Sequence, residues 1–263
     1  MPDLLTFTPR PRNIKEAAAF RLFFSGGRFT IPAVQPGQLA SLIDHTLLQP
    51  EATEKDVRRL CREARTHAFA AVCVNPCYVH AAVVALRGTN VGICSVVGFP
   101  LGAGLPDIKA REARRVIALG ATEVDMVLAL GALKSGRRDL VLADIAGVAG
   151  VCRRQGALCK VILETCLLTR AEKIIAARLC IEAGAHFVKT STGFGSGGAT
   201  VADVRLLAGI VAPAGLGIKA AGGIRSLADA CALLAAGATR LGTSRGLQLL
   251  AEARRASRTA SAA

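Results

Sequence analysis

The sequence predicts a single (β/α)8 TIM barrel with an N-terminal extension, and three observations favour this α/β fold. From about Gln38, short apolar runs alternate with Ala- and Leu-rich amphipathic helices, which is the rhythm of a parallel sheet built through right-handed crossovers. Eight such runs are present, enough to close the sheet into a barrel. The length of 263 residues also suits one barrel.

The composition supports helices packed closely on a buried sheet. The chain is 52% hydrophobic but only 4% aromatic, and it has 27 glycines. Strands of parallel sheets are apolar on both faces because helices cover them. An open doubly wound sheet is the alternative fold. If it bound a dinucleotide, a glycine-rich fingerprint would follow the first strand, and the sequence there, LIDHTLLQP, is not one.

Residues 1–37 differ in character from the rest of the chain. They contain a PRPR run and several further prolines and glycines, and they allow one short helix from about Asn13 to Phe24. We interpret this segment as an extension that is partly helical or flexible, because chain termini are often poorly ordered. The alternative is an oligomer contact through Phe20, Phe23 and Phe24.

The barrel is expected to span residues 38–250, with a C-terminal tail at 251–263. The expected strands are Leu42–His45, Ala70–Val74, Val91–Val97, Glu123–Leu128, Ala157–Glu164, His186–Thr190, Gly217–Ala220 and Arg240–Thr243. The expected helices are Glu54–Thr66, Pro76–Leu86, Ile108–Leu119, Asp139–Gln155, Arg170–Ala183, Val201–Val211 and Leu227–Ala236. Glycine closes four of these helices, at Gly120, Gly156, Gly184 and Gly237, and each glycine is followed by alanine and then a strand.

The net charge of +14 raises the question of nucleic-acid binding. The arginines, however, are dispersed over several helices, and Tyr78 is the one tyrosine among few aromatic residues that could stack on bases. We therefore expect no specific nucleic acid and instead a basic surface that attracts anionic substrates. No apolar run reaches the roughly 20 residues of a membrane span, and no signal peptide is recognisable.

The nine cysteines are scattered, odd in number and mostly within apolar runs. This pattern indicates reduced thiols in a cytoplasmic protein. Cys73 and Cys77 lie four residues apart, but no second pair has the spacing of a zinc site, so we expect no metal.

Three lysines lie within predicted strands, where lysine is rare. They are Lys160, Lys189 and Lys219, spaced 29 and 30 residues apart, and one strand–helix unit is about 30 residues long. The three side chains are therefore expected at equivalent points of neighbouring strands, converging inside the barrel. Strand alternation places Lys160, Ile162 and Glu164 inward, and Asp125 lies one unit earlier.

Lysines in this setting suit Schiff-base chemistry. An amine attacks a carbonyl only when neutral, and burial beside another cation lowers its pKa. One of Lys189 and Lys219 would be the nucleophile and the other its cationic neighbour. Asp125 could move protons, directly or through water, and Lys160 could hold Asp125 ionised and oriented.

Glycine-rich loops follow the last three strands, at 193–198, 221–223 and 242–246. In barrels of this kind phosphate often binds in the loops after strands seven and eight, at a short helix N-terminus. At the end of the first strand, Asp44 and Thr46 add polar groups to the same end of the barrel as these loops. Cys73 could line the pocket or be a small core residue.

Several blocks closely resemble the deoxyribose-phosphate aldolase family of class I aldolases, over about Leu42 to Leu250. These blocks are LIDHTLL, AVCVNP, VVGFPLG, EVDMV, CKVILET, FVKTSTGF, GGAT, KAAGGIR and RLGTS. The resemblance implies reversible cleavage of 2-deoxy-D-ribose 5-phosphate to D-glyceraldehyde 3-phosphate and acetaldehyde. It implies no metal and no other cofactor, and a homo-oligomer, either a dimer or a tetramer.

The resemblance also implies residue roles. Lys189 would form the Schiff base, Lys219 would be the cation that lowers its pKa, Asp125 would be the general acid/base, and Lys160 would support Asp125. The substrate and its phosphate would be held by Asp44, Thr46, Cys73, Thr192, Gly193, Gly222, Gly223, Gly242, Thr243 and Ser244.

Three features depart from the family pattern. The lead before Gln38 is longer than usual. Arg245 stands where a small residue often follows GTS, and could either contact phosphate or point away. The chain ends in RTASAA, without the C-terminal tyrosine of many members, so Asp125 with water must relay protons.

Two other functions stay open at this point. Another Schiff-base barrel enzyme, an aldolase or transaldolase for a longer sugar phosphate, would use the same lysines. A basic nucleic-acid-binding or scaffold protein without activity would have no use for the intact set of lysines and Asp125.

Overall fold

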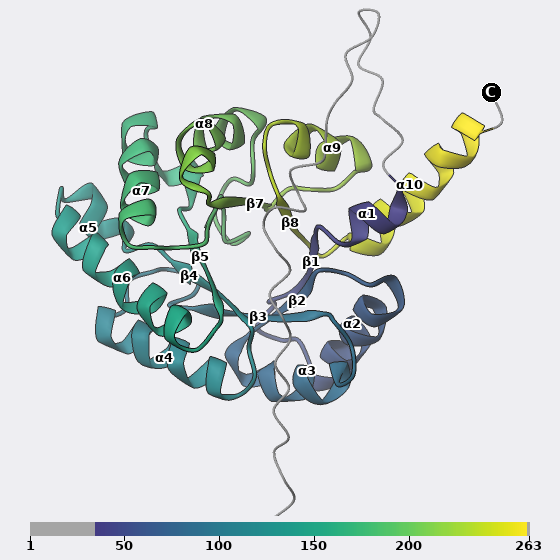
Figure 1. Cartoon of the computed structure of the whole chain (residues 1–263), viewed down its shortest axis with the longest axis horizontal. Helices are drawn as coiled ribbons and strands as arrows, with labels where there is room; N and C mark the ends of the chain where they lie inside the picture. Colours follow the sequence, from purple (N-terminus) through teal and green to yellow (C-terminus); the bar gives the residue numbers. More distant parts are fainter. Residues whose placement is uncertain (1–34, 262–263) are drawn as a thin grey trace, which may run out of the picture.

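The structure, a computed structural model, describes residues 35–261 and confirms the predicted closed barrel of eight parallel strands in sequence order (Figure 1). The last strand pairs with the first, so the sheet has no free edge. The strands are β1 (Ile43–Leu47), β2 (Ala71–Val74), β3 (Gly92–Val97), β4 (Glu123–Val127), β5 (Leu158–Ile162), β6 (Phe187–Lys189), β7 (Gly217–Ala221) and β8 (Arg240–Thr243). All eight coincide with predicted strands to within a few residues.

Helices surround the barrel (Figure 1). They are α1 (Pro36–Ala40), α2 (Glu54–His67), α3 (Val79–Leu86), α4 (Pro106–Ala118), α5 (Leu130–Lys134), α6 (Arg138–Arg154), α7 (Arg170–Glu182), α8 (Val201–Val211), α9 (Leu227–Ala235) and α10 (Gly246–Ser261), with 3-10 turns at Pro76–Tyr78, Thr165–Leu167 and Ala212–Ala214. The short helices α1 and α5 were not expected. Within residues 35–261, no helix is both long and apolar enough to cross a membrane.

The two predicted domain boundaries do not coincide with breaks in the described fold. Helix α1 crosses the boundary at 37/38, and α10 continues through residue 250 to Ser261. Ala253 of α10 is buried in the core between the helices and the barrel, so the described part of the predicted tail continues the last barrel helix. The expected helix at 13–24 and the phenylalanine contact lie outside the described residues.

Local sequence determines where the helices begin and end. Capping boxes open α2, α7 and α9, in which Thr53, Thr169 and Ser226 each accept from the backbone of an acidic residue three positions later. The four predicted glycine stops all adopt positive φ, for example 70° at Gly156 and 74° at Gly184, a conformation that costs glycine little.

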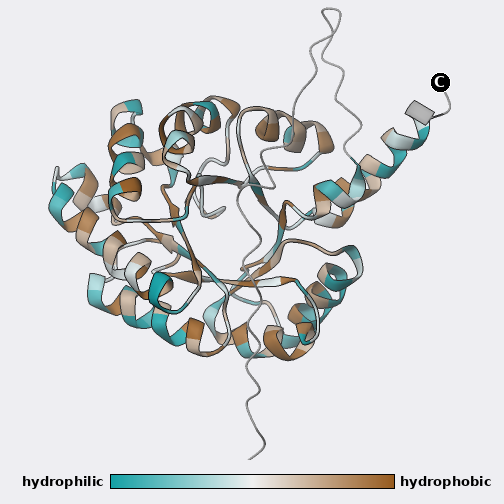
Figure 2. Ribbon diagram, in the orientation of Figure 1, coloured by the Kyte–Doolittle hydropathy of each residue, from teal (hydrophilic) through white to brown (hydrophobic). Residues whose placement is uncertain are grey.

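Apolar side chains form two separate cores. The larger lies between the strands and the helices and includes Val161 and Leu163, as the alternation in β5 predicts. Helices turn their apolar stripe to this layer and their polar residues outward (Figure 2). The smaller core lies inside the barrel and consists of Leu48, Ala71, Cys73, Cys94 and Val96.

Strand register determines the height of each lysine in the barrel. Lys189 pairs directly with Lys219, but its partner on β5 is Ile162, because Lys160 pairs with Phe187. The expectation of three equivalent positions is therefore wrong for Lys160, which lies one inward-facing position deeper. Equal spacing along the chain does not reveal the stagger between neighbouring strands that closing a barrel requires.

One buried ion pair lies outside the barrel interior. Lys109 of α4 contacts Asp144 of α6 at 2.6 Å and donates to the carbonyl oxygen of Val127 at 3.0 Å. Burial raises the pKa of the Asp144 carboxyl, against the effect of Lys109. The pair joins two helices to the end of β4, which carries Asp125 near its middle.

Candidate active site

The barrel interior contains a cluster of seven charged side chains, all buried. The cations are Lys160 of β5, Lys189 of β6, Lys219 of β7 and Arg240 of β8, and the carboxylates are Asp44 of β1 and Glu123 and Asp125 of β4. Buried charges are tolerated when they are paired. Four cations face three carboxylates, so the cluster carries one excess positive charge when every group is ionised.

Asp125 is at the centre of this cluster. Its Oδ1 lies 2.6 Å from the Nζ of Lys160, and its Oδ2 lies 2.9 Å from Lys189 and 2.7 Å from Lys219. Burial alone would raise the pKa of the Asp125 carboxyl, but the charges of the three lysines hold it well below the usual value. Asp125 is therefore ionised at neutral pH.

The three lysines differ in how many carboxylates they contact. Lys160 lies 2.7 Å from Glu123 as well as close to Asp125, and Lys219 lies 2.5 Å from Asp44 as well as close to Asp125. Opposing the effect of burial, these carboxylates raise the pKa of both lysines. Lys189 is within ion-pair distance of Asp125 alone. Lys189 therefore has the fewest carboxylate partners of the three lysines.

Arg240 closes the cluster beneath the lysines. It contacts Asp44 at 2.6 Å and Glu123 at 3.3 Å, and its guanidinium lies 5.7 Å from the ring centroid of Phe187. Burial would raise the pKa of Asp44, but Arg240, Lys219 and Lys160 together hold it well below the usual range. Asp44 and Glu123 thereby fix Lys219 and Lys160 in their charged state.

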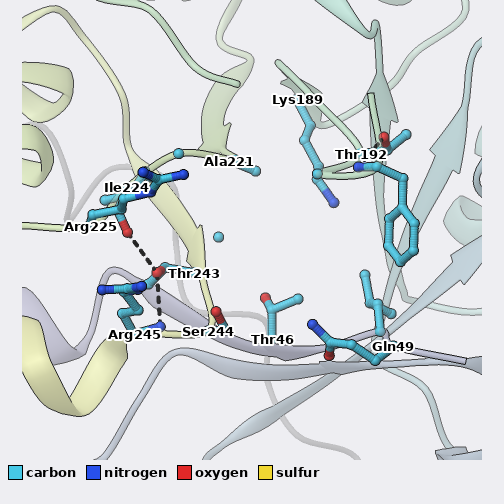
Figure 3. A pocket seen from close by; sticks show the side chains of 16 residues that line it. Thr46, Gln49, Lys189, Thr192, Ala221, Ile224, Arg225, Thr243, Ser244 and Arg245 are labelled. Carbon is cyan, nitrogen blue, oxygen red and sulfur yellow. Dashed lines mark hydrogen bonds between the residues drawn. The ribbon is translucent and has the colours of Figure 1, made fainter. Parts of the chain in front are cut away.

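A pocket of about 200 Å³ opens above the charged cluster. Its walls come from the loops after β1, β6, β7 and β8, and are formed by Thr46, Leu48, Gln49, Lys189, Thr192, Gly193, Phe194, Ala221, Gly222, Gly223, Ile224, Arg225, Gly242, Thr243, Ser244 and Arg245. Lys189 points into this space, with Thr46 and Gln49 on the opposite side (Figure 3). Of the three central lysines, Lys189 is the one that lines the pocket; Lys160 and Lys219 have no exposed surface.

The far side of the pocket from Thr192 is positively charged and rich in backbone N–H groups. Arg225 and Arg245 lie together there (Figure 3), next to the first residues of α10. Thr243 braces the two loops, because its hydroxyl donates to the carbonyl of Ile224 at 3.2 Å and accepts from the N–H of Arg245 at 3.0 Å. Guanidinium groups beside a helix N-terminus form a suitable site for a phosphate group.

Glu164 anchors the glycine-rich loop after Lys189. Its buried carboxylate accepts hydrogen bonds from both the hydroxyl and the backbone N–H of Thr192. Glu164 itself has a φ of 52°, an uncommon conformation for a residue with a side chain. The strained backbone directs the carboxylate under the loop, where it holds Thr192 and Gly193 beside Lys189.

The predicted site residues fall into two groups. Those lining the pocket are Thr46, Lys189, Thr192, Gly193, Gly222, Gly223, Gly242, Thr243 and Ser244, with Arg245 beside them. Four others, Asp44, Cys73, Asp125 and Lys160, are fully buried beneath it, as is Lys219. Asp44 and Cys73 were expected to touch substrate, but Asp44 instead pairs with Lys219 and Arg240, and Cys73 packs in the inner core.

Several site residues were not predicted from the sequence, and four of them are charged or contact Asp125. Glu123 and Arg240 belong to the charged cluster, Arg225 lines the pocket, and Cys94 donates to Asp125 at 3.1 Å. Charged residues inside predicted strands were the available signal for Glu123 and Arg240, by the same criterion that singled out the lysines. Cys94 offered none, since nine cysteines are scattered along the chain.

Among residues 35–261, two groups of buried side chains have the proximity of metal ligands. They are Cys73, Cys94 and Asp125, and Asp44, Cys94 and Glu123, each with ligand atoms within 4.8 Å of one another. Lys160 lies 2.6 Å from Asp125 and 2.7 Å from Glu123. Ammonium groups this close already neutralise the carboxylates and oppose the approach of a cation.

Comparison with known proteins gives one consistent result. The family described as DeoC/LacD family aldolase matches residues 39–252. The deoxyribose-phosphate aldolase of Geobacillus sp. (strain WCH70) is 51% identical over 212 residues, which cover 81% of this chain and 94% of the relative. The Brevibacillus brevis enzyme of the same name is 53% identical over 215 residues, covering 81% of this chain and 95% of that enzyme.

Solved structures agree. A putative deoxyribose-phosphate aldolase from Coccidioides immitis has a TM-score of 0.81 and 38% identity, with 92% of this chain and 95% of that one covered. The deoxyribose phosphate aldolase from Aeropyrum pernix, described as having a unique tetrameric structure, has a TM-score of 0.77 and 40% identity, with 82% and 91% covered.

The charged cluster predicts a pH-dependent effect of Asp44→Asn. At pH 7 the variant is expected to lose about 3 kcal/mol of unfolding free energy, because Lys219 and Arg240 lose a buried carboxylate. The folded-state pKa of Asp44 is lowered, so its contribution is complete above the unfolded pKa of about 4 and is lost as the pH falls through the folded value. The difference from the wild type should therefore narrow below about pH 4.

Urea unfolding of the wild type and of Asp44→Asn at a series of pH values measures this difference in unfolding free energy. Asp107→Asn, which removes an exposed carboxylate of α4, is the control and should change stability little at any pH. An Asp44→Asn deficit that stays constant down to acidic pH would show that the ionised carboxylate is not the source of the stabilisation.

Proposed function

The chain belongs to the DeoC/LacD family of aldolases, and from that premise we propose how its residues carry out the reaction of its relatives. It is a class I aldolase that reversibly cleaves 2-deoxy-D-ribose 5-phosphate to D-glyceraldehyde 3-phosphate and acetaldehyde. The observation that carries the residue assignment is that Lys189 alone of the three central lysines combines access to the pocket with a single carboxylate partner.

In the proposed mechanism, the neutral amine of Lys189 attacks C1 of the open-chain aldehyde. Loss of water gives an iminium, which draws electrons from the bond between C2 and C3 as that bond breaks. The proton of the C3 hydroxyl leaves, glyceraldehyde 3-phosphate departs, and the enamine on Lys189 is protonated at C2. Hydrolysis of the resulting iminium releases acetaldehyde.

The excess positive charge of the cluster supports a neutral Lys189. Loss of one proton from Lys189 leaves three cations facing three carboxylates, which is the balanced state for a buried cluster. Lys219 stays charged through Asp44 and Asp125, and its charge opposes protonation of Lys189. We assign to Lys219 the role of the neighbouring cation that the resemblance implies.

Asp125 is suited to exchanging a proton with Lys189. The Nζ atoms of Lys189 and Lys219 lie 2.9 and 2.7 Å from the same oxygen, Oδ2. This oxygen can therefore take a proton from Lys189 and return it, while Lys219 stays charged beside it. Lys160 holds the second oxygen of Asp125 at 2.6 Å and fixes its orientation. Proton exchange with the substrate then proceeds through Lys189, or through water in the pocket.

We further propose that the molecule is a homo-oligomer that works in the cytoplasm. The tetrameric structure of the Aeropyrum pernix relative supports oligomerisation. Free thiols at all nine cysteines support a reducing compartment.

Lys189→Ala tests the function. Cleavage of deoxyribose 5-phosphate should fall by at least about 10³-fold, since the covalent step is lost. The measurement is acetaldehyde release, with circular dichroism to verify folding. The wild-type protein is assayed in the synthetic direction with acetaldehyde or dihydroxyacetone phosphate as donor. Use of dihydroxyacetone phosphate in preference to acetaldehyde would indicate the alternative reaction, on a longer sugar phosphate.

Arg245 lines the proposed phosphate end of the pocket. Arg245→Ser should lower kcat/KM for deoxyribose 5-phosphate about tenfold, because one charge-assisted contact is lost, and should leave kcat/KM for unphosphorylated 2-deoxyribose unchanged. Arg255→Ser removes an equal charge from an exposed position of α10, the helix that follows Arg245, and is the matched control. An equal fall in kcat/KM for the two variants would show that Arg245 has no specific role in binding phosphate. An equal fall for the phosphorylated and unphosphorylated substrates of Arg245→Ser would show the same.

A further inference from the structure

Two cysteines face each other inside the barrel, next to the catalytic cluster. Cys73 of β2 and Cys94 of β3 are register partners on adjacent parallel strands, and both belong to the inner core. Adjacent strands lie about 4.8 Å apart, within the range of about 4.4–6.8 Å between Cα atoms that a disulfide requires. Their sulfur atoms lie within 4.8 Å of each other, so a side-chain rotation can bring them into bonding distance.

The two thiols have different surroundings. The neighbouring Cys94 thiol, together with the charges of Lys219 and Lys189, lowers the pKa of Cys73 despite its burial. Burial and the neighbouring Cys73 and Asp125 instead raise the pKa of Cys94. The Sγ of Cys94 lies 3.1 Å from Oδ1 of Asp125 and 3.3 Å from Nζ of Lys160. Cys73 is thus the more nucleophilic sulfur, and Cys94 is the thiol in contact with the catalytic cluster.

We propose that Cys73 and Cys94 form a redox-sensitive thiol pair, which a small hydroperoxide converts to a disulfide that reversibly lowers aldolase activity. Lys189, which lines the pocket, lies close enough for its charge to act on Cys73. A molecule as small as hydrogen peroxide suits a site in which both thiols are fully buried.

The chemistry needs one hydroperoxide and two thiols. The Cys73 thiolate attacks the peroxide, the O–O bond breaks, and an S–O bond forms as an alcohol or water leaves with a proton. The sulfur of Cys94 then attacks the Cys73 sulfenic acid. The S–O bond breaks, the S–S bond forms, and water leaves with the thiol proton. The peroxide gains two electrons, and each sulfur supplies one.

The disulfide would disturb the site through Asp125. In the reduced protein the Cys94 thiol donates to Oδ1 of Asp125. A sulfur bonded to Cys73 has no hydrogen to donate and must turn away from the carboxylate. Asp125 then loses one of its buried donors, and we expect turnover to fall about tenfold.

A second pair of neighbouring thiols provides an internal comparison. Cys152 and Cys159 lie in the core between the barrel and the helices. A hydrogen bond with Cys152 and burial raise the pKa of Cys159 well above its usual value. With so little thiolate at Cys159, that sulfur is expected to react slowly.

The test treats the intact protein with hydrogen peroxide and maps its disulfides by peptide mass spectrometry while activity is followed. We expect a cross-linked peptide joining Cys73 to Cys94, two hydrogen atoms lighter than the reduced pair, and an activity loss of about tenfold that dithiothreitol reverses. Cys73→Ser and Cys94→Ala should each abolish the cross-link and the reversible loss, measured as the fraction of each variant's own starting activity. Cys152→Ala should retain both the cross-link between Cys73 and Cys94 and the reversible loss of activity.

Three results would overturn the proposal. Peroxide inactivation without the cross-link would show that the activity is lost through damage at another residue. Inactivation of Cys94→Ala to the same extent as the wild type would show this too. A cross-link that left activity unchanged would remove the coupling to Asp125. Because peptide mapping does not depend on catalysis, it tests the thiol pair even if the proposed reaction were wrong.

Discussion

The structure depends on one buried carboxylate, Asp125, which lies in the middle of a barrel with three ammonium groups around it. Taking these charges out of water is costly, and only close pairing makes it tolerable. Each of the three lysines meets Asp125 at 2.6–2.9 Å. Two of them have further carboxylate partners, Glu123 for Lys160 and Asp44 for Lys219. Lys189 has none, and on this difference in pairing the proposed mechanism assigns it the reactive amine.

The barrel makes this arrangement possible by bringing distant residues to one point. Asp44 and Arg240 are 196 residues apart in the chain and 2.6 Å apart in space. The barrel interior has two levels along its axis. The charged cluster lies within the strands, and the pocket lies above it in the loops that follow them, where enzymes of this fold bind their substrates. Lys189, the last residue of β6, lies at the boundary and belongs to both.

The sequence predicted the barrel and all eight strands because the alternation of strand and helix patterns, the glycines that end helices and the apolar runs are all local signals. It also predicted that Lys160, Lys189, Lys219 and Asp125 meet. It could not predict the height of Lys160, since strand stagger depends on closure of the whole sheet. Nor could it show that Asp44 pairs with Arg240 instead of facing the pocket, because both choices satisfy the same alternation. The positions of Cys94 beside Asp125 and of Arg225 in the pocket likewise depend on contacts between remote segments.

Trapping the covalent intermediate decides whether Lys189 is the nucleophile. The protein is incubated with acetaldehyde, reduced with borohydride, digested and analysed by peptide mass spectrometry. We expect a two-carbon adduct on Lys189 and none on the two lysines beneath it, because Lys160 and Lys219 are fully buried and held charged by their carboxylates. An adduct on Lys219 or Lys160 would contradict the assignment of roles, and no adduct on the folded protein would contradict acetaldehyde as the donor.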